Sequence, residues 1–459
     1  MSALNVLLVT YSFPPAGGVG VLRAGSFARY FPSEGLRVDV LTTRNASAVG
    51  TDPSLLSKIP PEVMVHRTIT LDLPFAVKKG LKKLIVGRRS GSINASDTGS
   101  SRKPNLLKRL VQDILLPDPQ VTWVPMLTRA ATRIVKERNI DLVLITVPPF
   151  SSVLLVERLR KRYPTLPIVL DFRDEWLATT IDLVSFSRSD RAARIAHQIE
   201  ATAVKDATAV VAVTDAARDE IRRRYPDESE HKFRVVPNGF DASMLGASEP
   251  ITRPRSDDRV VVTYIGSVYG STEPTTLVEA LLALPSEVKS RLQIRFIGHI
   301  EEPRYRDSLL RLGDMVELNG FLPQRAALAA MKDSDYALLV SHDPLNVSAK
   351  FYDYVGAHKP ILATIHSRGD VRAKLDELRA GWWADSRDVK GICRLFIDAV
   401  NRIDTLASEF RPELEKVAGY ERGVLAHRYA DLLREIAHWH NGVSPELPRV
   451  ELAGGSCEL

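Results

Sequence analysis

The sequence has little cysteine, no long apolar run and no secretory leader. Cys393 and Cys457 are the two cysteines among 459 residues, far apart in the sequence and without partners at ligand spacing, so neither a disulfide framework nor a structural zinc site is supported. No apolar run approaches the roughly 18 residues that a membrane span needs. The start "MSALNVLLVTYSF" lacks the basic segment of a signal peptide. We therefore expect a globular protein of the cytoplasm.

Positive charge is concentrated in one segment of the chain. The formal net charge is +6, but residues 66–110 hold eleven Lys or Arg against two Asp, which leaves −3 for the rest. A basic surface along the whole chain would suggest nucleic acid, and this distribution does not. It indicates one local site, which we expect to face an anionic partner.

Short apolar runs alternate with stretches of helical spacing, and the pattern occurs twice. Runs that are apolar throughout indicate parallel strands covered by helices on both faces. After "VVPNGFD" (235–241) and a charged stretch at 248–259, a second set of runs begins with "VVVTYIGS" (260–267). We therefore predict an α/β protein with two doubly wound, Rossmann-like domains that join near residue 240. The helical stripe at 423–439 predicts one further packed helix.

A glycine-rich corner, "YSFPPAGGVG" (11–20), follows the first apolar run. In an open parallel sheet, such a loop lies at the carboxyl ends of the strands and leaves backbone N–H groups unpaired. Gly17 and Gly18 have no Cβ, so the phosphates of a ligand can approach these groups closely. A tight turn without a ligand explains the same residues. The corner does not match G-x-G-x-x-G and so does not favour a nicotinamide cofactor.

Several motifs occur in the order found in the GT-B glycosyltransferases. They are the glycine corner with the residues after it, "LDFRDEW" (170–176), "VVPNGFD", "YIGSVYG" (264–270), "FIG" (296–298) and "SAKFYDYVGAHKPILA" (348–363). Over about residues 4–438 the sequence most resembles the family-4 retaining enzymes. The resemblance implies two Rossmann-like domains that face a cleft, with the last helix crossing back to the first domain. It also implies that the first domain binds the acceptor and the second a nucleotide sugar.

The resemblance divides the chain as follows. We expect an N-terminal acceptor domain at 1–238 with a basic insertion at about 74–116, a C-terminal nucleotide-sugar domain at 239–410, crossover helices at 411–440 that pack on the first domain, and a loose tail at 441–459.

The donor would contact residues from both domains. The expected donor-binding residues are Gly17, Gly18, Gly266, Ser267, His342, Ser348 and Asp353. Asp353 stands where the family usually has Glu, and a carboxylate there can accept both ribose hydroxyls. A carboxylate that favours the dipole at the start of a helix is the structural alternative for Asp353.

Three charged residues are the catalytic candidates. Lys350 could offset the charge of the leaving diphosphate, with a solvated lysine at a helix start as the alternative. Arg173 and Asp174 follow a strand, where their side chains could face a ligand. The alternative for "DFRDEW" is a salt-bridged corner with Trp176 in the core.

The acceptor is expected to contact the first domain. The expected acceptor-binding residues are Arg23, Lys82 and Lys83. Arg23 is also the alternative to Lys350 as the positively charged group that contacts the diphosphate. The basic segment suits a lipid diphosphate at the membrane or another anionic molecule, so contact with the inner face of the plasma membrane is expected. A solvated insertion without a partner is the alternative.

The sequence departs from the family pattern in three places. The family usually has an Arg and a Lys after the second-domain glycine turn, and this sequence has neither. The first Glu of the family's E-x7-E pair would fall at Leu345. The His that the family often has in the first domain has no counterpart here, where Arg173 and Asp174 occupy that neighbourhood. The single D-x-D, at Asp333 and Asp335, precedes an apolar run, so we expect it to be structural and predict no metal.

The resulting hypothesis is a retaining glycosyltransferase that moves a sugar from a nucleoside-diphosphate sugar to an acceptor hydroxyl, with no bound cofactor. Its expected context is the synthesis of polysaccharides, glycolipids or glycoconjugates. A sugar-nucleotide 2-epimerase with the same architecture and a catalytically silent GT-B subunit of a partner transferase are the alternatives. The sugar, the nucleotide, the acceptor and the oligomeric state stay open.

Overall fold

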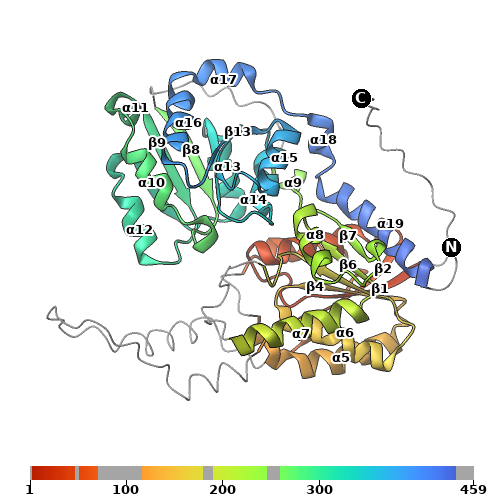
Figure 1. The fold of residues 1–459 in the computed structure, drawn as a ribbon. Helices are drawn as coiled ribbons and strands as arrows, with labels where there is room; N and C mark the ends of the chain where they lie inside the picture. The colour runs from red at the N-terminus through yellow and green to blue at the C-terminus, as the bar shows by residue number, and fades with distance from the viewer. Residues whose placement is uncertain (1–2, 47–50, 71–115, 179–189, 246–258, 441–459) are drawn as a thin grey trace, which may run out of the picture.

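The computed structural model describes residues 3–46, 51–70, 116–178, 190–245 and 259–440. Two parallel β-sheets, each with helices on both faces, form two domains (Figure 1). The expected insertion at about 74–116, with Lys82 and Lys83, lies outside the described residues apart from its last position. The expected tail at 441–459 lies outside them as well.

The first sheet has seven parallel strands in the order β3-β2-β1-β4-β5-β6-β7. The strands are β1 (Leu4–Val9), β2 (Leu36–Thr43), β3 (Met64–Thr68), β4 (Leu142–Val147), β5 (Ile168–Phe172), β6 (Ala209–Ala212) and β7 (Phe233–Val235). The helices of this half are α1 (Leu22–Tyr30), α2 (Pro53–Leu56), α5 (Val124–Glu137), α6 (Leu154–Arg162), α7 (Asp190–Asp206) and α8 (Asp215–Arg224), with short 3-10 helices at η1 (Val19–Val21), η3 (Pro119–Trp123), η4 (Phe150–Val153) and η5 (Glu230–Lys232).

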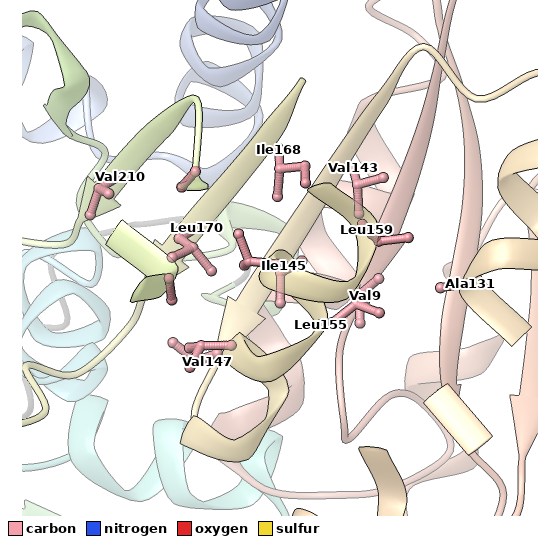
Figure 2. Packing of buried hydrophobic residues seen from close by; sticks show 14 of the residues in the cluster. Val9, Ala131, Val143, Ile145, Val147, Leu155, Leu159, Ile168, Leu170 and Val210 are labelled. Atoms are coloured by element: carbon pink, nitrogen blue, oxygen red, sulfur yellow. The ribbon is translucent and has the colours of Figure 1, made fainter. Parts of the chain in front are cut away.

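Alternate residues of the central strands pack on opposite faces of this sheet. Every residue of β4 is buried, as expected for a strand between two layers of helices. Val143 and Ile145 pack with Leu155 and Leu159 of α6 on one face (Figure 2). Leu142 and Leu144 belong to the cluster on the other face. The apolar runs of the sequence therefore correspond to strands that are buried on both sides.

The last helix of the chain completes the second face. α19 (Arg422–His440) runs back to the first domain beside α1 (Figure 1). Tyr429 packs edge-on against Phe27 with ring centroids 4.9 Å apart, and Leu433 joins the same cluster. The predicted return of the C-terminal helix to the first domain is confirmed.

The second sheet has six parallel strands in the order β10-β9-β8-β11-β12-β13. The strands are β8 (Val260–Ile265), β9 (Leu292–Ile297), β10 (Val316–Gly320), β11 (Tyr336–Ser341), β12 (Ile361–Ile365) and β13 (Gly381–Asp385). The helices are α9 (Ala242–Leu245), α10 (Thr275–Leu282), α11 (Ser286–Arg291), α12 (Pro303–Leu310), α13 (Gln324–Lys332), α14 (Ala349–Gly356), α15 (Asp370–Leu378), α16 (Val389–Asn401), α17 (Ile403–Glu409) and α18 (Leu414–Ala418), with 3-10 helices at η6 (Gly270–Thr272) and η7 (Gly313–Met315).

The chain passes between the domains twice, and the two crossings are hydrogen-bonded to each other. The backbone N–H of Phe240 donates to the carbonyl of Tyr420 at 3.1 Å, and that of Arg422 donates to the carbonyl of Phe240 at 2.9 Å. A Cβ on Gly239 would lie 2.2 Å from the oxygen of Tyr420. Glycine at this position therefore permits the close approach of the two segments.

Candidate active site

The glycine corner is held at both ends and open between them. Arg67 donates a hydrogen bond from Nη2 to the carbonyl of Pro14, and Arg173 donates from Nη1 to the carbonyl of Gly20. Gly18 has a φ of +97°, in the left-handed region that favours glycine, and a Cβ there would meet no atom within 4 Å. Gly17 precedes it and is half-buried. The corner thus combines a fixed backbone with open space in front of it.

Arg23 lies in the interior of the first domain rather than at an open surface. Its guanidinium forms a salt bridge with Asp171 at 2.7 Å and donates to the carbonyls of Val236 and Pro237, each at 2.9 Å. The Arg23 side chain is 7% exposed, and that of Asp171 is fully buried. The guanidinium donors of Arg23 therefore have partners inside the protein, which favours a structural role over the expected contact with the acceptor or the diphosphate.

The motif "DFRDEW" contains side chains of two kinds. Glu175 is buried, forms an ion pair with Arg224 and accepts the N–H of Ala178 at 2.6 Å. Trp176 is buried and stacks on Phe150 with ring centroids 4.7 Å apart. With the buried Asp171, these residues give the salt-bridged corner that the structural alternative described.

Arg173 and Asp174 differ from their neighbours in the motif. The side chain of Arg173 bonds to three carbonyls, those of Val147, Pro148 and Gly20, and its burial lowers the pKa of the guanidinium. No hydrogen bond or ion pair reaches the Asp174 carboxylate from the described residues. Burial raises the pKa of Asp174, Arg173 opposes this shift, and the charge of Asp343 in the second domain adds to it. Asp174 therefore differs from Asp171 and Glu175, whose carboxylates are held in buried ion pairs.

The second glycine turn, at the end of β8, lies under Lys350. Gly266 has a φ of +120°, and a Cβ there would lie 3.1 Å from the Nζ of Lys350. Gly298 follows β9, and a Cβ at this position would lie 2.1 Å from the carbonyl oxygen of Gly266. The absence of a side chain at Gly298 therefore permits the close approach of the turns after β8 and β9. The Nζ of Lys350 donates to the hydroxyl of Tyr264 at 2.6 Å, and this hydroxyl donates to the carbonyl of Ser267 at 2.8 Å.

Lys350 brings a positive charge to a place that is already favourable for anions. It lies in the first turn of α14, where free N–H groups and the helix dipole attract negative charge. Ser348, the N-cap residue, makes no capping hydrogen bond with its side chain. In the described part of the chain no carboxylate forms an ion pair with Lys350. Burial lowers the pKa of Lys350 to about 8, and Tyr269 opposes this shift.

The remaining predicted donor residues lie around this turn or further along α14. Ser267 is exposed, and His342 points its Nε2 to the carbonyl of Glu273 at 2.9 Å. Asp353 lies one turn after Lys350 and is half-buried; burial raises its pKa to about 6, Arg422 opposes this shift and Asp241 adds to it. The carboxylate of Asp353 therefore lies close to the crossing between the domains.

Sequence reasoning assigned no role to Tyr269. This residue is half-buried just before η6. Burial raises the pKa of its phenol, the charge of Lys350 lowers it and the charge of Asp174 raises it. Charged groups from both domains thus act on one phenol. The motif "YIGSVYG" contains Tyr269, but its spacing carries no signal for this contact.

Hydrogen bonds also join the domains beside this region. The hydroxyl of Thr214 donates to the carbonyl of Leu345 at 2.5 Å, and the N–H of Ala216 donates to the Asp370 carboxylate at 2.9 Å. Within the described ranges, no three His, Cys, Asp or Glu side chains are grouped as a metal site. Asp335 accepts the N–H of Val261 at 2.8 Å, which gives the D-x-D stretch a structural contact. No described helix is long and apolar enough to span a bilayer.

The family model for Glycosyltransferase Family 4 matches residues 84–244. Sucrose-phosphate synthase from Thermosynechococcus elongatus has a similar structure, with a TM-score of 0.65 and 13% identity over 94% of this chain and 99% of its own. The chain has the GT-B fold. This finding confirms the predicted fold class and the resemblance to GT-B glycosyltransferases.

Two other GT-B structures show the same likeness. Anabaena Alr3699/HepE, in complex with UDP and glucose, has a TM-score of 0.61 and 14% identity over 94% of this chain and 99% of its own. WaaG, a glycosyltransferase involved in lipopolysaccharide biosynthesis, has a TM-score of 0.56 and 14% identity over 95% of this chain and 100% of its own. The comparison with curated proteins returned no match.

Proposed function

We propose that this GT-B protein is a retaining glycosyltransferase that moves a sugar from a nucleoside-diphosphate sugar to an acceptor hydroxyl. The observation that carries the proposal is Lys350, whose ammonium lies over the Gly266 turn at the start of α14 with no carboxylate ion pair among the described residues. A diphosphate gains negative charge as it leaves the sugar, and a preorganised cation at this place stabilises it.

The donor would lie between the two glycine turns. Backbone N–H groups near Gly17 and Gly18 and the hydroxyl of Ser267 would contact its phosphates. The N–H of Gly266 itself donates to the carbonyl of Ile297 at 2.8 Å, so the second turn would contribute Lys350 and the Ser267 hydroxyl. His342 and Ser348 border the second turn, and Asp353 would accept the ribose hydroxyls. The complexes of Anabaena HepE with UDP and with UDP-glucose support a nucleotide sugar as the donor class.

Three protein groups have distinct roles in the proposed reaction. The bond from the anomeric carbon to the diphosphate oxygen breaks, and the acceptor oxygen forms the new bond on the same face. The acceptor proton passes to an oxygen of the departing diphosphate, so no separate general base is required. Lys350 offsets the leaving charge, Asp174 stabilises the positive charge that develops on the sugar, and Arg173 fixes the glycine corner.

The acceptor would be an anionic or lipid-linked molecule, used in polysaccharide, glycolipid or glycoconjugate synthesis at the inner face of the membrane. The basic segment at 66–110 supports this assignment, because each basic residue near an anionic surface adds on the order of 1 kcal/mol of attraction. We expect the protein to co-sediment with anionic vesicles at low salt. Equal binding to neutral vesicles, unchanged by salt, would contradict this part of the proposal.

A catalytically silent subunit is the second candidate. It is favoured by Leu345, which stands where the family has its first Glu and whose carbonyl is bound by Thr214. A 2-epimerase has less support, because it needs several acid–base carboxylates around one sugar. Asp171 and Glu175 are both engaged in buried ion pairs, which leaves Asp174 as the open carboxylate of their motif.

A panel of nucleotide sugars tests the proposal directly. Thermal unfolding in the presence of each compound identifies the donor, because a ligand that binds the folded state raises the melting temperature. Release of nucleoside diphosphate with each stabilising donor, with and without a hydroxyl acceptor, then measures turnover. Stabilisation without turnover for every acceptor would support the silent subunit, and no stabilisation by any nucleotide sugar would overturn both candidates.

A further inference from the structure

We propose that Arg44 and Arg67 form a binding site for a phosphate group of the acceptor. This inference rests on the proposed glycosyl transfer, since it assigns the chemical class of the second substrate. The two residues lie in the first domain beside Pro14 of the glycine corner. The transfer chemistry proposed above uses neither of them.

The topology of the sheet brings the two arginines together. Arg44 directly follows β2, and Arg67 is the residue before the last one of β3, the strand that pairs with β2. The N–H of Arg44 donates to the carbonyl of Thr68 at 2.7 Å. Arg67 donates to the carbonyl of Thr43 at 3.4 Å and to that of Pro14, so its guanidinium lies against the glycine corner.

No opposite charge compensates these two side chains in the described part of the chain. Arg67 is half-buried and Arg44 is exposed, and neither forms an ion pair with a described residue. Burial lowers the pKa of Arg67, and the positive charge of Arg44 lowers it further. A half-buried cation next to a like charge costs folding free energy, which an anion bound between the two groups would offset.

Phosphate is the anion that this pair fits best. Guanidinium groups present parallel N–H donors that match phosphate oxygens, and two of them can share one phosphate. The N–H donors of Arg67 that are not bonded to Pro14 and Thr43 remain for this contact. A phosphate monoester or diester therefore matches the donors available here.

The position of the pair separates this phosphate from the donor diphosphate. In the sheet order, β1 and β4 lie between β2 and β5. Asp174 follows the end of β5 by two residues. Three strand spacings of about 4.8 Å place the ends of β2 and β5 roughly 14 Å apart. A phosphate at Arg44 and Arg67 is then about one sugar unit or more away from the reacting centre, as expected for a group on the acceptor rather than on the leaving nucleotide.

The test uses inorganic phosphate as the probe in the full-length Lys350→Ala protein, so that the donor site contributes less to the response. The melting temperature is followed as phosphate replaces chloride at constant ionic strength. We expect Arg44→Glu, added to this background, to weaken the apparent affinity for phosphate by roughly tenfold or more. Arg37→Glu is the matched control, because Arg37 is exposed at the other end of the same strand.

An equal phosphate response in the Arg44→Glu and Arg37→Glu proteins would overturn the inference, whether the response is kept or lost in both. A second arm identifies the source of the phosphate. Co-sedimentation with phosphatidic acid vesicles that is lost only in Arg44→Glu supports a lipid phosphate, and co-sedimentation that both proteins keep supports a soluble phosphate ester. Failure of the proposed transfer is measured separately, as the absence of stabilisation of the unmutated protein by nucleotide sugars.

Discussion

Lys350 combines a buried amine, a hydroxyl partner and a helix start in one place. Its pKa of about 8 follows from burial, which disfavours the ammonium form. If the protonated form stabilises the leaving diphosphate, kcat/KM should fall as the pH rises through about 8, because this parameter reports the free enzyme. Lys350→Arg keeps its charge and should shift the alkaline limb of the profile to higher pH. The same limb in both proteins would assign the titration to another group.

Replacing Lys350 with alanine separates its chemical role from stability. We expect Lys350→Ala to lower kcat by on the order of 10²–10³, the range for loss of one preorganised donor in the transition state. Because the folded-state pKa is lowered, the ammonium costs folding free energy below pH 8, and this cost disappears as the pH rises. The variant should therefore melt no lower than the unmutated protein at pH 7. Transfer at the unmutated rate would exclude Lys350 from the chemistry.

Gly18 is a position where backbone conformation and ligand approach coincide. At a φ of +97° a β-branched residue is strained, although the surrounding space is open. We expect Gly18→Val to lose about 1–2 kcal/mol of stability and nearly all transfer activity. Gly35→Val is the control, because Gly35 has a φ of +75° in the turn before β2, at the opposite end of the sheet from the glycine corner. Equal activity in the two variants would show that the corner is only a turn.

At the scale of elements, the strands and the last helix could be predicted, and the pairing of single side chains could not. Strands such as β4 are buried on both faces, so their apolar runs are visible in the sequence. The partner of Arg23 lies 148 residues away on β5, and local pattern contains no information about that contact. The same applies to Tyr269, whose charged neighbours come from two domains. Lys350 and Gly266 belong to two separate motifs of the sequence, and the structure brings them side by side.

α14 carries a second titratable residue, Asp353, at the crossing between the domains. Its pKa of about 6 lies above the ordinary value, so the folded protein holds this proton over a pH range where the unfolded chain releases it. The free energy of unfolding therefore falls as the pH rises from about 4 to 6. We expect Asp353→Asn to stabilise the protein at pH 7.5 by on the order of 1–2 kcal/mol and to have no effect near pH 4. The expected gain is smaller than the pKa shift alone would give, because solvent screens the partly exposed side chain.

The same substitution should also weaken the binding of the nucleotide-sugar donor if Asp353 accepts hydrogen bonds from the ribose hydroxyls. Loss of a charged acceptor predicts a roughly tenfold or larger increase in the Kd of the nucleotide. Asp307→Asn, at an exposed position of α12, is the control for both measurements. A stabilised variant with unchanged nucleotide affinity would restrict Asp353 to the crossing.

α19 contributes to the first domain although it follows the second in the sequence. Tyr429 is fully buried against Phe27 and Phe31, and its hydroxyl lies 3.3 Å from the Asp171 carboxylate. We expect Tyr429→Ala to destabilise the protein by about 3–5 kcal/mol, as is usual for truncation of a buried aromatic residue. Arg428→Ala, on the exposed face of the same helix, should change the stability by less than about 0.5 kcal/mol. Urea unfolding followed by circular dichroism measures both. Similar losses would mean that this face of α19 is not packed in solution.

At the scale of the whole molecule, the proposed transfer requires that the two domains present Asp174 and Lys350 to one substrate. Their relative position depends on the two crossings, which are joined at Phe240, Tyr420 and Arg422. Gly356, at the end of α14, packs against the ring of Phe240, where its own Cβ would lie 2.4 Å from a ring carbon. The helix that carries Lys350 therefore ends against the crossing, and a change at the crossing should reach the groups that we propose to act in the transfer.

Gly239→Ala tests this coupling without changing any charge. Its Cβ would lie 2.2 Å from the carbonyl oxygen of Tyr420 and 2.6 Å from Leu425, so the two crossings have to separate, which costs about 1–3 kcal/mol. Misplacement of reacting groups by about 1 Å lowers rates by up to 10²-fold, so we expect kcat to fall at least tenfold. The affinity for nucleotide should stay within about twofold, because most of the expected donor contacts belong to the second domain. Gly270→Ala is the control, since a Cβ there meets no atom within 4 Å. Equal kcat in the two variants would show that the proposed transfer does not depend on the spacing of the crossings.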